Sequence, residues 1–215
     1  PVSINRKGEV IFLAPRPDVS VQRTQEVLEA AIKVFARMGF HKARMDDIAQ
    51  EASVSKGVLY FYFKSKDAII EALLKQIFSR SLHIQELLQT EGSVRDHLLD
   101  LTDTFGHEVQ MMKLLLPVAF EFYSLAGRNK TVNEFVGNYY RELINSLGKL
   151  IEQGITRGEL RSDLDTTQTA RTIISIFEGM TLLWILEKGK FDWLDNAKNS
   201  ITQFIRGIER CPYQT

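Results

Sequence analysis

The sequence predicts an all-α protein in which a small N-terminal unit of three helices precedes a larger helical domain. Three observations support this prediction. Apolar residues recur at spacings of three and four through most of the chain, residues 39–66 have the composition of two short helices joined by a tight turn, and no convincing strand alternation follows Lys66. A chain of 215 residues with 44% hydrophobic side chains is long enough to bury both cores.

The first helix of the N-terminal unit is expected from about residue 24. Its apolar stripe consists of Val27, Leu28, Ala31, Val34, Phe35 and Met38. Gly39 should end this helix, because a left-handed residue after the last turn costs least when it is glycine. A second helix of about two turns is expected over residues 45–52, with Ile48 and Ala49 facing inward.

A third helix should begin at Ser55, since a serine side chain can accept a hydrogen bond from the first turn. The turn before it, residues 52–54, is too short for the two helices to do anything but cross steeply. In such helix-turn-helix geometry the N-terminal half of the second helix enters the major groove of DNA. Lys56, Gly57 and Val58 suit close approach to bases and phosphates. Four further side chains could donate hydrogen bonds to phosphate: Tyr60, Tyr62, Lys64 and Lys66.

The four successive aromatic residues at 60–63 admit a different interpretation. A helical hairpin inside an all-helical enzyme or scaffold could bury such residues, and for any one of them the core is the simpler assignment. Four in a row cannot all face one core on a helix, so at least two should be exposed or lie against a partner. Leu59 and Phe63 are expected to face inward.

The run Ala-Ser-Val-Ser-Lys-Gly-Val-Leu-Tyr-Phe-Tyr-Phe-Lys-Ser-Lys-Asp at residues 52–67, preceded by Asp-Ile-Ala at 47–49, resembles the DNA-binding signature of the TetR family of bacterial repressors. The match covers about residues 20–80, with the helix-turn-helix motif at 44–63. The resemblance implies a three-helix DNA-binding domain there and a helical domain for ligand binding and dimerisation over residues 81–215.

The resemblance also implies roles for individual residues. It places Lys56, Gly57, Val58, Phe61 and Tyr62 on the recognition helix, Tyr60 and Lys66 at phosphate-contacting positions, and Arg44 at the start of the preceding helix. The full expected DNA-binding set is Arg44, Met45, Ser55, Lys56, Gly57, Val58, Tyr60, Phe61, Tyr62, Lys64 and Lys66. Two residues depart from the family pattern, because Arg44 stands where a threonine or serine usually caps the second helix and Ser53 replaces the usual turn glycine. The first change weakens the cap, and the second is tolerable if Ser53 avoids positive φ or bears some strain.

The charge distribution supports a DNA-binding head. The whole chain carries 27 basic and 27 acidic side chains, so it has no overall nucleic-acid signature. Residues 1–66 hold 11 Lys and Arg against 7 Asp and Glu, whereas the remainder holds 16 against 20. A basic head on an acidic body would orient the protein toward DNA.

The N-terminal arm, residues 1–19, is expected to be flexible, with a short extended piece as the alternative. Three basic residues would let such an arm touch DNA: Arg6, Lys7 and Arg16. The single cysteine, Cys211, excludes an intramolecular disulfide framework and favours a reducing, cytoplasmic compartment. No uninterrupted apolar run approaches the roughly 20 residues that span a bilayer, so no membrane partner is expected.

After Lys66 the chain is expected to be helical throughout. Ser65 should cap a long helix that links the head to the body. Further helix starts are expected at three capping-box patterns: Ser93 with Asp96, Thr131 with Glu134, and Asp165 with Gln168. Pro117 should begin or kink a helix, because proline lacks the N–H that a helix interior needs.

The helix expected over residues 166–187 is apolar around almost its whole circumference, and such a helix needs partners on two sides. The last helix has a single apolar stripe. The two look like the pair with which TetR family members form a four-helix dimer interface. The expected interface residues are Ile173, Phe177, Met180, Trp184, Leu194, Ile201, Phe204, Ile205 and Ile208. The alternative is a helix fully buried within one chain.

A cavity for an inducer in the body is a further implication of the resemblance. The expected ligand-binding residues are Met111, Leu115, Phe120, Tyr123, Phe135, Tyr139 and Phe177. Each of them is also a normal core residue when taken alone. As a set they favour an apolar or aromatic small molecule over a sugar or an anion.

Four polar residues, Asp96, Asp100, Asp103 and His107, are spaced to share one helix face, where they could hold a cation. The opposite face is apolar, so we expect a solvated face and no metal site. The sequence has no glycine-rich phosphate loop, nucleophilic serine elbow or zinc-protease motif. Nothing in it indicates an enzyme or a bound cofactor.

These patterns predict a homodimeric, ligand-responsive repressor that leaves a palindromic operator when an inducer binds. The inducer would bias a two-state arrangement of the DNA-binding heads. Two alternatives stay open: a helical ligand-binding or enzymatic protein whose head has lost DNA binding, and an activator in place of a repressor.

Overall fold

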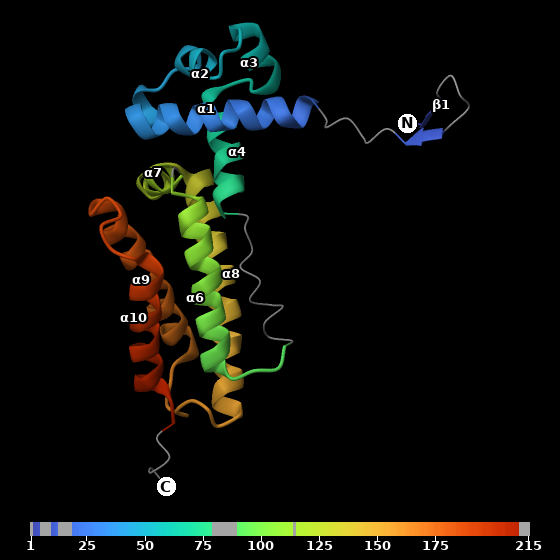
Figure 1. The fold of residues 1–215 in the computed structure, drawn as a ribbon. Coiled ribbons are helices and arrows are strands. Elements are labelled where there is room, and N and C mark those ends of the chain that lie inside the picture. The colour runs from blue at the N-terminus through green and yellow to red at the C-terminus, as the bar shows by residue number, and fades with distance from the viewer. Residues whose placement is uncertain (1, 5–9, 13–18, 79–89, 114, 211–215) are drawn as a thin grey trace. The chain divides into compact units, whose positions relative to one another are not determined.

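The computed structural model describes residues 2–4, 10–12, 19–78, 90–113 and 115–210. The chain forms two compact units, Pro1–Leu73 and Leu74–Thr215 (Figure 1). Several positions singled out in the sequence lie outside the described residues: Arg6, Lys7, Arg16, Cys211 and the expected domain boundary at 80 and 81.

The first unit contains α1 (Val19–Lys42), α2 (Met45–Glu51), α3 (Lys56–Tyr62) and the first part of α4 (Lys66–Phe78). Gly39 has a φ of 73°, in the left-handed region, and ends the regular part of α1 as predicted. The most deeply buried side chains of this unit include Val27, Ala31, Val34, Phe35, Ile48, Leu59, Ile69 and Leu73. The predicted inward orientation of Leu59 and Phe63 is confirmed, and so is the exposure of two of the four aromatic residues.

A short strand pair precedes α1. β1 (Val2–Ile4) and β2 (Val10–Phe12) are antiparallel, with Val2 opposite Phe12. The rest of the described chain consists of helices and their connections, as predicted. A short extended piece was the alternative prediction for the N-terminal arm, and both strands lie in this arm. Strands of three residues are too short to leave a recognisable alternation in a sequence, so a strand pair was not predicted.

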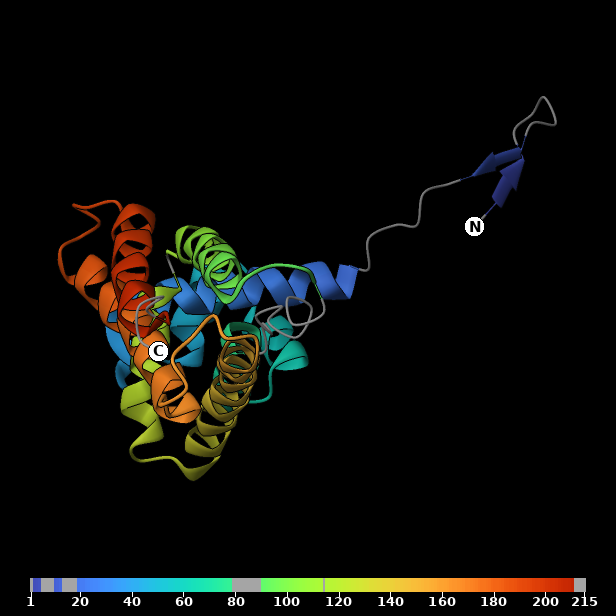
Figure 2. The same cartoon turned by 90° about the horizontal axis from the view of Figure 1, so that it is seen from below.

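The second unit continues α4 and adds α6 (Val94–Met111), α7 (Leu116–Ala126), α8 (Lys130–Thr156), α9 (Thr166–Leu186) and α10 (Trp193–Ile208). α8 packs against α6, α7 and α9, and α10 packs against α6 and α9 (Figure 1, Figure 2). The main core includes Leu98, Leu150, Ile151, Ile173, Ile201 and Ile205. Burial of each such side chain contributes about 1.5–3 kcal/mol.

Two of the three predicted capping sites are correct. Ser93 Oγ accepts a hydrogen bond from the Asp96 N–H at 3.2 Å, and Asp96 Oδ2 accepts one from the Ser93 N–H at 3.2 Å. Asp165 caps α9 by accepting a hydrogen bond from the Gln168 N–H at 2.8 Å. Each contact satisfies an N–H group that the helix start leaves free.

The third predicted capping site, Thr131, is wrong. Asn129 caps α8 instead, since its side-chain oxygen accepts a hydrogen bond from the Val132 N–H at 3.1 Å. Asparagine caps a helix as well as threonine does, so the sequence offered two candidates two positions apart. Pro117 lies in the first turn of α7, where its missing N–H is harmless, as predicted.

α9 is the helix that is apolar around most of its circumference. Its inner side is buried through Ala170, Ile173 and Trp184, whereas several leucines near its end are exposed. By length and composition alone α9 could also cross a bilayer, a property that it shares with core helices of soluble proteins. Its exposed apolar side therefore needs an explanation from the assembly of the protein.

Candidate DNA-binding surface and ligand cavity

α3 begins after Ser55, as predicted. Ser55 Oγ accepts a hydrogen bond from the Val58 N–H at 3.3 Å and so satisfies one free N–H of the first turn. The helix buries Leu59 and leaves Val58, Tyr60 and Phe61 40%, 36% and 73% exposed. One side of α3 thus serves the core, and the other presents apolar and aromatic groups to the outside.

No described neighbour requires Gly57 to be a glycine. A Cβ placed there would meet only Ser55 Oγ within 4 Å, at 3.9 Å. Glycine nevertheless costs a helix about 1 kcal/mol relative to alanine. The missing side chain keeps the outer surface of α3 open to close approach by another molecule.

Two exposed lysines belong to the same surface. Lys56 Nζ lies 2.7 Å from Asp46 Oδ1 on α2, and the hydrogen bond to this carboxylate raises the pKa of the lysine. Lys64 Nζ donates to Tyr60 O at 3.0 Å. An ammonium has three N–H donors, so one such contact leaves capacity for a phosphate oxygen.

Lys66 has a different role from the predicted phosphate contact. Its ammonium donates to Phe40 O at 2.7 Å, to Ala43 O at 3.0 Å and to His41 O at 3.3 Å. These three bonds match its three N–H donors and satisfy carbonyl groups near the end of α1. Lys66 therefore holds the end of α1 against the start of α4.

Arg44 precedes α2 without capping it through its side chain, because a guanidinium has no acceptor. The Asp47 carboxylate instead accepts a hydrogen bond from the Arg44 N–H at 2.9 Å. Of the two reciprocal hydrogen bonds of a capping box, the one that satisfies the N–H of the N-cap residue is thus present. The Arg44 side chain is exposed and that of Met45 is half-buried.

Ser53 adopts the left-handed conformation, with φ of 53°, that a glycine would adopt at lower cost. Its N–H donates to Gln50 O at 3.1 Å, and the Val54 N–H donates to Ala49 O at 3.0 Å. These are the two bonds of a Schellman motif at the end of α2. A non-glycine residue in this conformation costs roughly 1–2 kcal/mol, so the turn bears strain.

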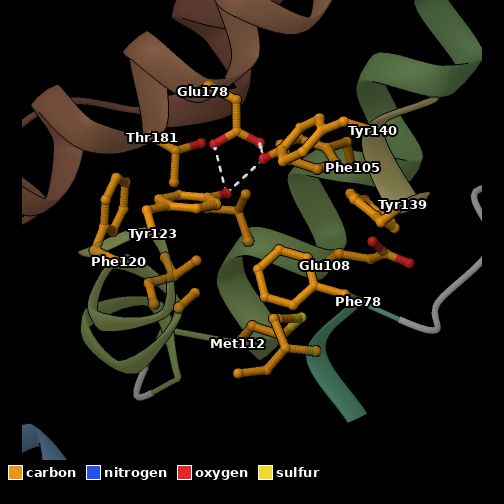
Figure 3. A pocket seen from close by; sticks show the side chains of 14 residues that line it. Phe78, Phe105, Glu108, Met112, Phe120, Tyr123, Tyr139, Tyr140, Glu178 and Thr181 are labelled. Carbon is orange, nitrogen blue, oxygen red and sulfur yellow. Dashed lines mark hydrogen bonds between the residues drawn. The ribbon is translucent and has the colours of Figure 1, made fainter. Parts of the chain in front are cut away.

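The second unit contains a cavity of about 60 Å³ between α4, α6, α7, α8 and α9 (Figure 3). Six aromatic side chains line it: Phe78, Phe105, Phe120, Tyr123, Tyr139 and Tyr140. A smaller cavity of about 20 Å³ between α6, α8 and α9 shares Phe105, Tyr139 and Glu178 with the first. In this conformation the two spaces have room for only a few molecules of the size of water.

Glu178 joins two tyrosines in a half-buried polar cluster at the wall of this cavity (Figure 3). Glu178 Oε1 accepts a hydrogen bond from the Tyr140 hydroxyl at 2.7 Å, Oε2 lies 3.2 Å from the Tyr123 hydroxyl, and the two hydroxyls are 2.5 Å apart. Burial raises the pKa of the Glu178 carboxyl, whereas the hydrogen bonds from the tyrosines act to lower it. Burial also raises the pKa of Tyr123 and Tyr140, so their hydroxyls stay protonated at neutral pH.

Four of the seven predicted ligand-binding residues line a cavity. Phe120, Tyr123 and Tyr139 line the larger one, and Phe177 lines the smaller one. The other three line neither of these two cavities, and their role in ligand binding stays a prediction: Met111, Leu115 and Phe135. Met111 is 80% exposed at the end of α6, because the helix turns its final residue outward.

The sequence interpretation missed Glu178 and Tyr140. The available signal was a single acidic residue within a helix that is apolar around almost its whole circumference. An ionisable side chain in such surroundings must be neutralised or paired, which makes it a candidate for a binding site.

The acidic face of α6 is engaged in local contacts. Asp96 belongs to the capping box of Ser93, and Asp103 Oδ1 lies 2.6 Å from Lys198 Nζ. Asp100 and His107 are exposed, as expected for a solvated face. Within the described part of the chain, no three His, Cys, Asp or Glu side chains are placed to hold a metal ion.

Most residues predicted for a dimer interface belong to the core of the single chain. Five are no more than 7% exposed: Ile173, Trp184, Ile201, Ile205 and Ile208. The other four are only half-buried and pack against that core: Phe177, Met180, Leu194 and Phe204. The apolar residues that α9 does expose are Leu182, Leu183 and Leu186, at 40%, 53% and 66%. Their spacing places them on one side of the helix.

A helix-turn-helix unit with an open recognition helix, joined to a helical unit that contains a cavity, defines a DNA-binding transcriptional regulator. The family model described as "Bacterial regulatory proteins, tetR family" matches residues 27–73. A second model, "Tetracyclin repressor-like, C-terminal domain", matches residues 98–193. The chain belongs to the TetR family of transcriptional regulators, and it is therefore not an enzyme.

Relatives and solved structures agree with this assignment. The fatty acid metabolism regulator protein of Bacillus subtilis is 22% identical over 185 residues, which cover 85% of this chain and 94% of that protein. The crystal structure of FadR from Bacillus subtilis in complex with stearoyl-CoA has a TM-score of 0.72 at 21% identity and covers 86% of this chain and 98% of that one. The structure of a transcriptional regulator from Saccharomonospora viridis in complex with choline has a TM-score of 0.69 at 23% identity, with coverage of 89% and 100%. Both structures confirm the fold.

Proposed function

We propose that this regulator is a homodimeric repressor that leaves a palindromic operator when a small molecule binds in the second unit. The observation that carries the proposal is the cavity beside Glu178. A half-buried carboxylate and two half-buried tyrosine hydroxyls at the wall of an apolar space lose part of their contact with water, which has a cost in free energy. An apolar cavity with a few convergent polar groups is the usual form of a small-molecule site.

The exposed side of α3 supports operator recognition. Gly57, Val58 and Phe61 would lie against bases and the groove wall, because this side of the helix is open. Lys56 and Lys64 would bind phosphate and fix the position of the helix without reading sequence. Arg44, Met45, Ser55, Tyr60 and Tyr62 complete the proposed DNA-binding set, from which Lys66 is removed.

The exposed leucines of α9 support dimerisation. A second copy related by two-fold symmetry would place Leu182, Leu183 and Leu186 against the same residues of its partner. Such a contact would bury a row of large apolar side chains that soluble proteins rarely leave open to water. Two copies would then present two α3 helices to the two halves of a palindrome.

The size of the cavity supports a conformational response. Structures of the same fold hold ligands as different as stearoyl-CoA and choline, so the fold is compatible with a small-molecule response but does not specify the ligand. A ligand of the size of either molecule would need more than the present space of about 60 Å³, so the surrounding helices would have to move apart. α4 lines the cavity through Ile77 and Phe78 and continues into the first unit, which gives the movement a path toward the DNA-binding helices.

Selection of binding sites from randomised DNA duplexes tests this proposal. We expect the full chain to select a palindrome, to bind it less tightly as salt increases, and to lose affinity when Lys56→Ala is introduced, whereas Lys190→Ala in the second unit has no effect. The selected site, placed across a promoter, should lower expression of a reporter. Selection of a single half-site would contradict the homodimer, and increased expression would contradict repression.

A further inference from the structure

The cavity of the second unit has a negative lining. Among its fourteen described lining residues, Glu108 and Glu178 are acidic and none is Lys, Arg or His. The smaller cavity likewise contains Glu178 and no basic residue. A buried anionic ligand would find no counter-charge here and would be repelled, whereas a cation would be paired.

Aromatic rings surround the same space at several orientations. The Phe78 ring lies 6.0 Å from Tyr123 and 5.4 Å from Tyr139 between centroids, and Tyr139 lies 5.2 Å from Tyr140, all edge to face. Rings in such arrangements present both faces and edges toward a common volume. The faces carry negative potential and attract ammonium groups, most strongly when water is excluded.

Apolar side chains continue from this polar end. The smaller cavity is lined by Leu101, Leu147 and Ile174 among others, and Glu178 belongs to the lining of both cavities. The site thus has a negative, aromatic end and an apolar extension. This arrangement matches a molecule with a cationic head and a hydrocarbon tail.

We propose that the ligand is a hydrophobic ammonium compound whose charged head lies at Glu178 among the aromatic rings and whose apolar part extends toward Leu147 and Ile174. This inference gives the chemical class of the ligand in the proposed function. It rests on that function only for the effect of the ligand on DNA binding, and not for the binding of the ligand itself.

The alternative is that Glu178 is a neutral member of a purely structural cluster. Three close oxygen contacts link Glu178, Tyr123 and Tyr140, and the two hydroxyls supply only two protons. A proton on the carboxyl would supply the third, in agreement with the raised pKa of Glu178 in the free protein. A bound cation would favour the carboxylate, so that proton would pass to solvent when the ligand binds.

The two interpretations differ in their response to pH. The groups that face Glu178 are Tyr123 from α7, Tyr139 and Tyr140 from α8, and Glu108 from α6, and none of them carries a positive charge. For a cationic ligand, affinity should therefore increase as pH rises through the pKa of Glu178, and binding should release a proton. A structural cluster predicts neither effect.

Three probes that share a ten-carbon chain test the ligand class by calorimetry on the full-length chain: decyltrimethylammonium, decan-1-ol and decanoate. The two ionic probes are used below their micelle concentrations and the alcohol below its solubility limit. We expect decyltrimethylammonium to bind at least about tenfold more tightly than decanoate, because the lining offers charge of one sign. Its affinity should rise between acid and mildly alkaline pH. Its binding heat should depend on the ionisation enthalpy of the buffer, as proton release requires.

Glu178→Gln keeps the size and the acceptor oxygen of the side chain but removes its charge. This variant should lose about tenfold or more in affinity for decyltrimethylammonium and change by less than about twofold for decan-1-ol. Glu142→Gln, an exposed position on α8, is the matched control and should change neither affinity. If the Glu178 variant does not fold, the pH series and the three probes on the unchanged protein decide the question.

Equal binding of decanoate and decyltrimethylammonium, or an unchanged ammonium affinity in folded Glu178→Gln, would overturn the inference. The outcome for the proposed function is separate. If decyltrimethylammonium binds tightly but operator affinity does not change, the proposed response to a ligand is contradicted, whereas the proposed chemical class of the ligand is supported. Release of the operator by a neutral or anionic molecule, without ammonium binding, keeps the ligand response but contradicts the ligand class.

Discussion

Lys64 and Lys66 are two positions apart, but the structure gives their ammonium groups different surroundings. Lys66 donates to three carbonyl oxygens near the end of α1, whereas Lys64, which follows α3, donates to one carbonyl oxygen of α3 and is exposed. Sequence reasoning treated them alike, because both are lysines that follow a recognition helix. The distinction depends on where α1 ends relative to α4, which only the folded chain determines.

Replacement of each lysine by methionine should separate the two roles. Lys66→Met should lower the free energy of unfolding by about 1.5–3 kcal/mol, because hydrogen bonds from a charged group to three carbonyl oxygens are lost, two of them partly buried. Lys64→Met should change the free energy of unfolding by less than about 0.5 kcal/mol. In a plot of log operator affinity against log salt concentration, its slope should be shallower by about 0.9 for each DNA-binding head, as expected for the loss of one phosphate contact. Urea denaturation and a salt titration measure the two effects. Equal losses of stability in both variants would contradict the assignment.

Glu178 is the residue whose ionisation should be visible in stability. Its pKa in the folded chain is raised by burial above the ordinary value of 4.5. The folded state thus favours the protonated form, and the resulting stabilisation is present at low pH and is lost as pH rises through the raised pKa. Glu178→Gln does not titrate at this position.

We therefore expect the stability of Glu178→Gln relative to the unchanged protein to increase from pH 5 to pH 8. Thermal unfolding at a series of pH values gives this difference directly. The exposed Glu142→Gln control should follow the unchanged protein in parallel at all pH values. A difference between Glu178→Gln and the unchanged protein that shrinks with rising pH would show that the carboxyl is stabilised in its charged form.

At the scale of helices, sequence patterns predicted most of the architecture. Ser55, Ser93 and Asp165 cap the helices expected of them, and Gly39 ends α1. These features depend on residues a few positions apart, so a single sequence contains them. The three-residue strands are too short to leave an alternation in the sequence. The cap of α8 was not predictable because Asn129 and Thr131 are equally good candidates.

α9 shows what the sequence could not resolve. Its apolar residues cover nearly the whole helix, and the pattern alone does not say which side meets its own chain and which side meets a partner. The structure buries Ile173 and Trp184 internally and exposes Leu182, Leu183 and Leu186. An outward apolar side of α9 that binds a partner stays a proposal. The residues proposed for it are now the three exposed leucines and no longer those predicted from the sequence.

A charge placed in this exposed row should prevent dimerisation without disturbing the fold. Leu183→Glu alters a side chain that is 53% exposed, so the core of the single chain is not affected. Sedimentation should give a mass near 24.6 kDa for this variant and twice that for the unchanged protein. Affinity for a palindrome should fall as well, because the two heads are no longer linked.

Val21→Glu provides the matched control. Val21 is 66% exposed in the first unit, so the same chemical change there should leave the mass of the assembly unchanged. If Leu183→Glu remains a dimer, the interface lies elsewhere. If the unchanged protein is a monomer at the concentrations at which it binds DNA, a different account of the exposed leucines is required.

At the scale of the whole molecule, the two units divide the functions of a regulator. The first carries an excess of basic residues and an open recognition helix, and the second carries a negative, aromatic cavity. The sequence indicated this division, since charge counts and a many-residue motif do not depend on knowing contacts. It did not identify Glu178, because the significance of one glutamate depends on side chains from four other helices.

The central claim is that occupation of the cavity controls DNA binding by the first unit. Ligand and operator must then weaken each other's binding by a common factor, which is commonly between about fivefold and 150-fold. Their coupling can be measured with one probe and one DNA. No knowledge of the natural ligand or of the regulated genes is needed.

The most direct measurement is the affinity of the full chain for its selected palindrome, by fluorescence anisotropy, with and without decyltrimethylammonium at a concentration that calorimetry shows to be saturating. We predict that the probe weakens DNA binding at least about fivefold and that the effect disappears in Glu178→Gln at the same probe concentration. An unchanged DNA affinity while the cavity is occupied would contradict the account.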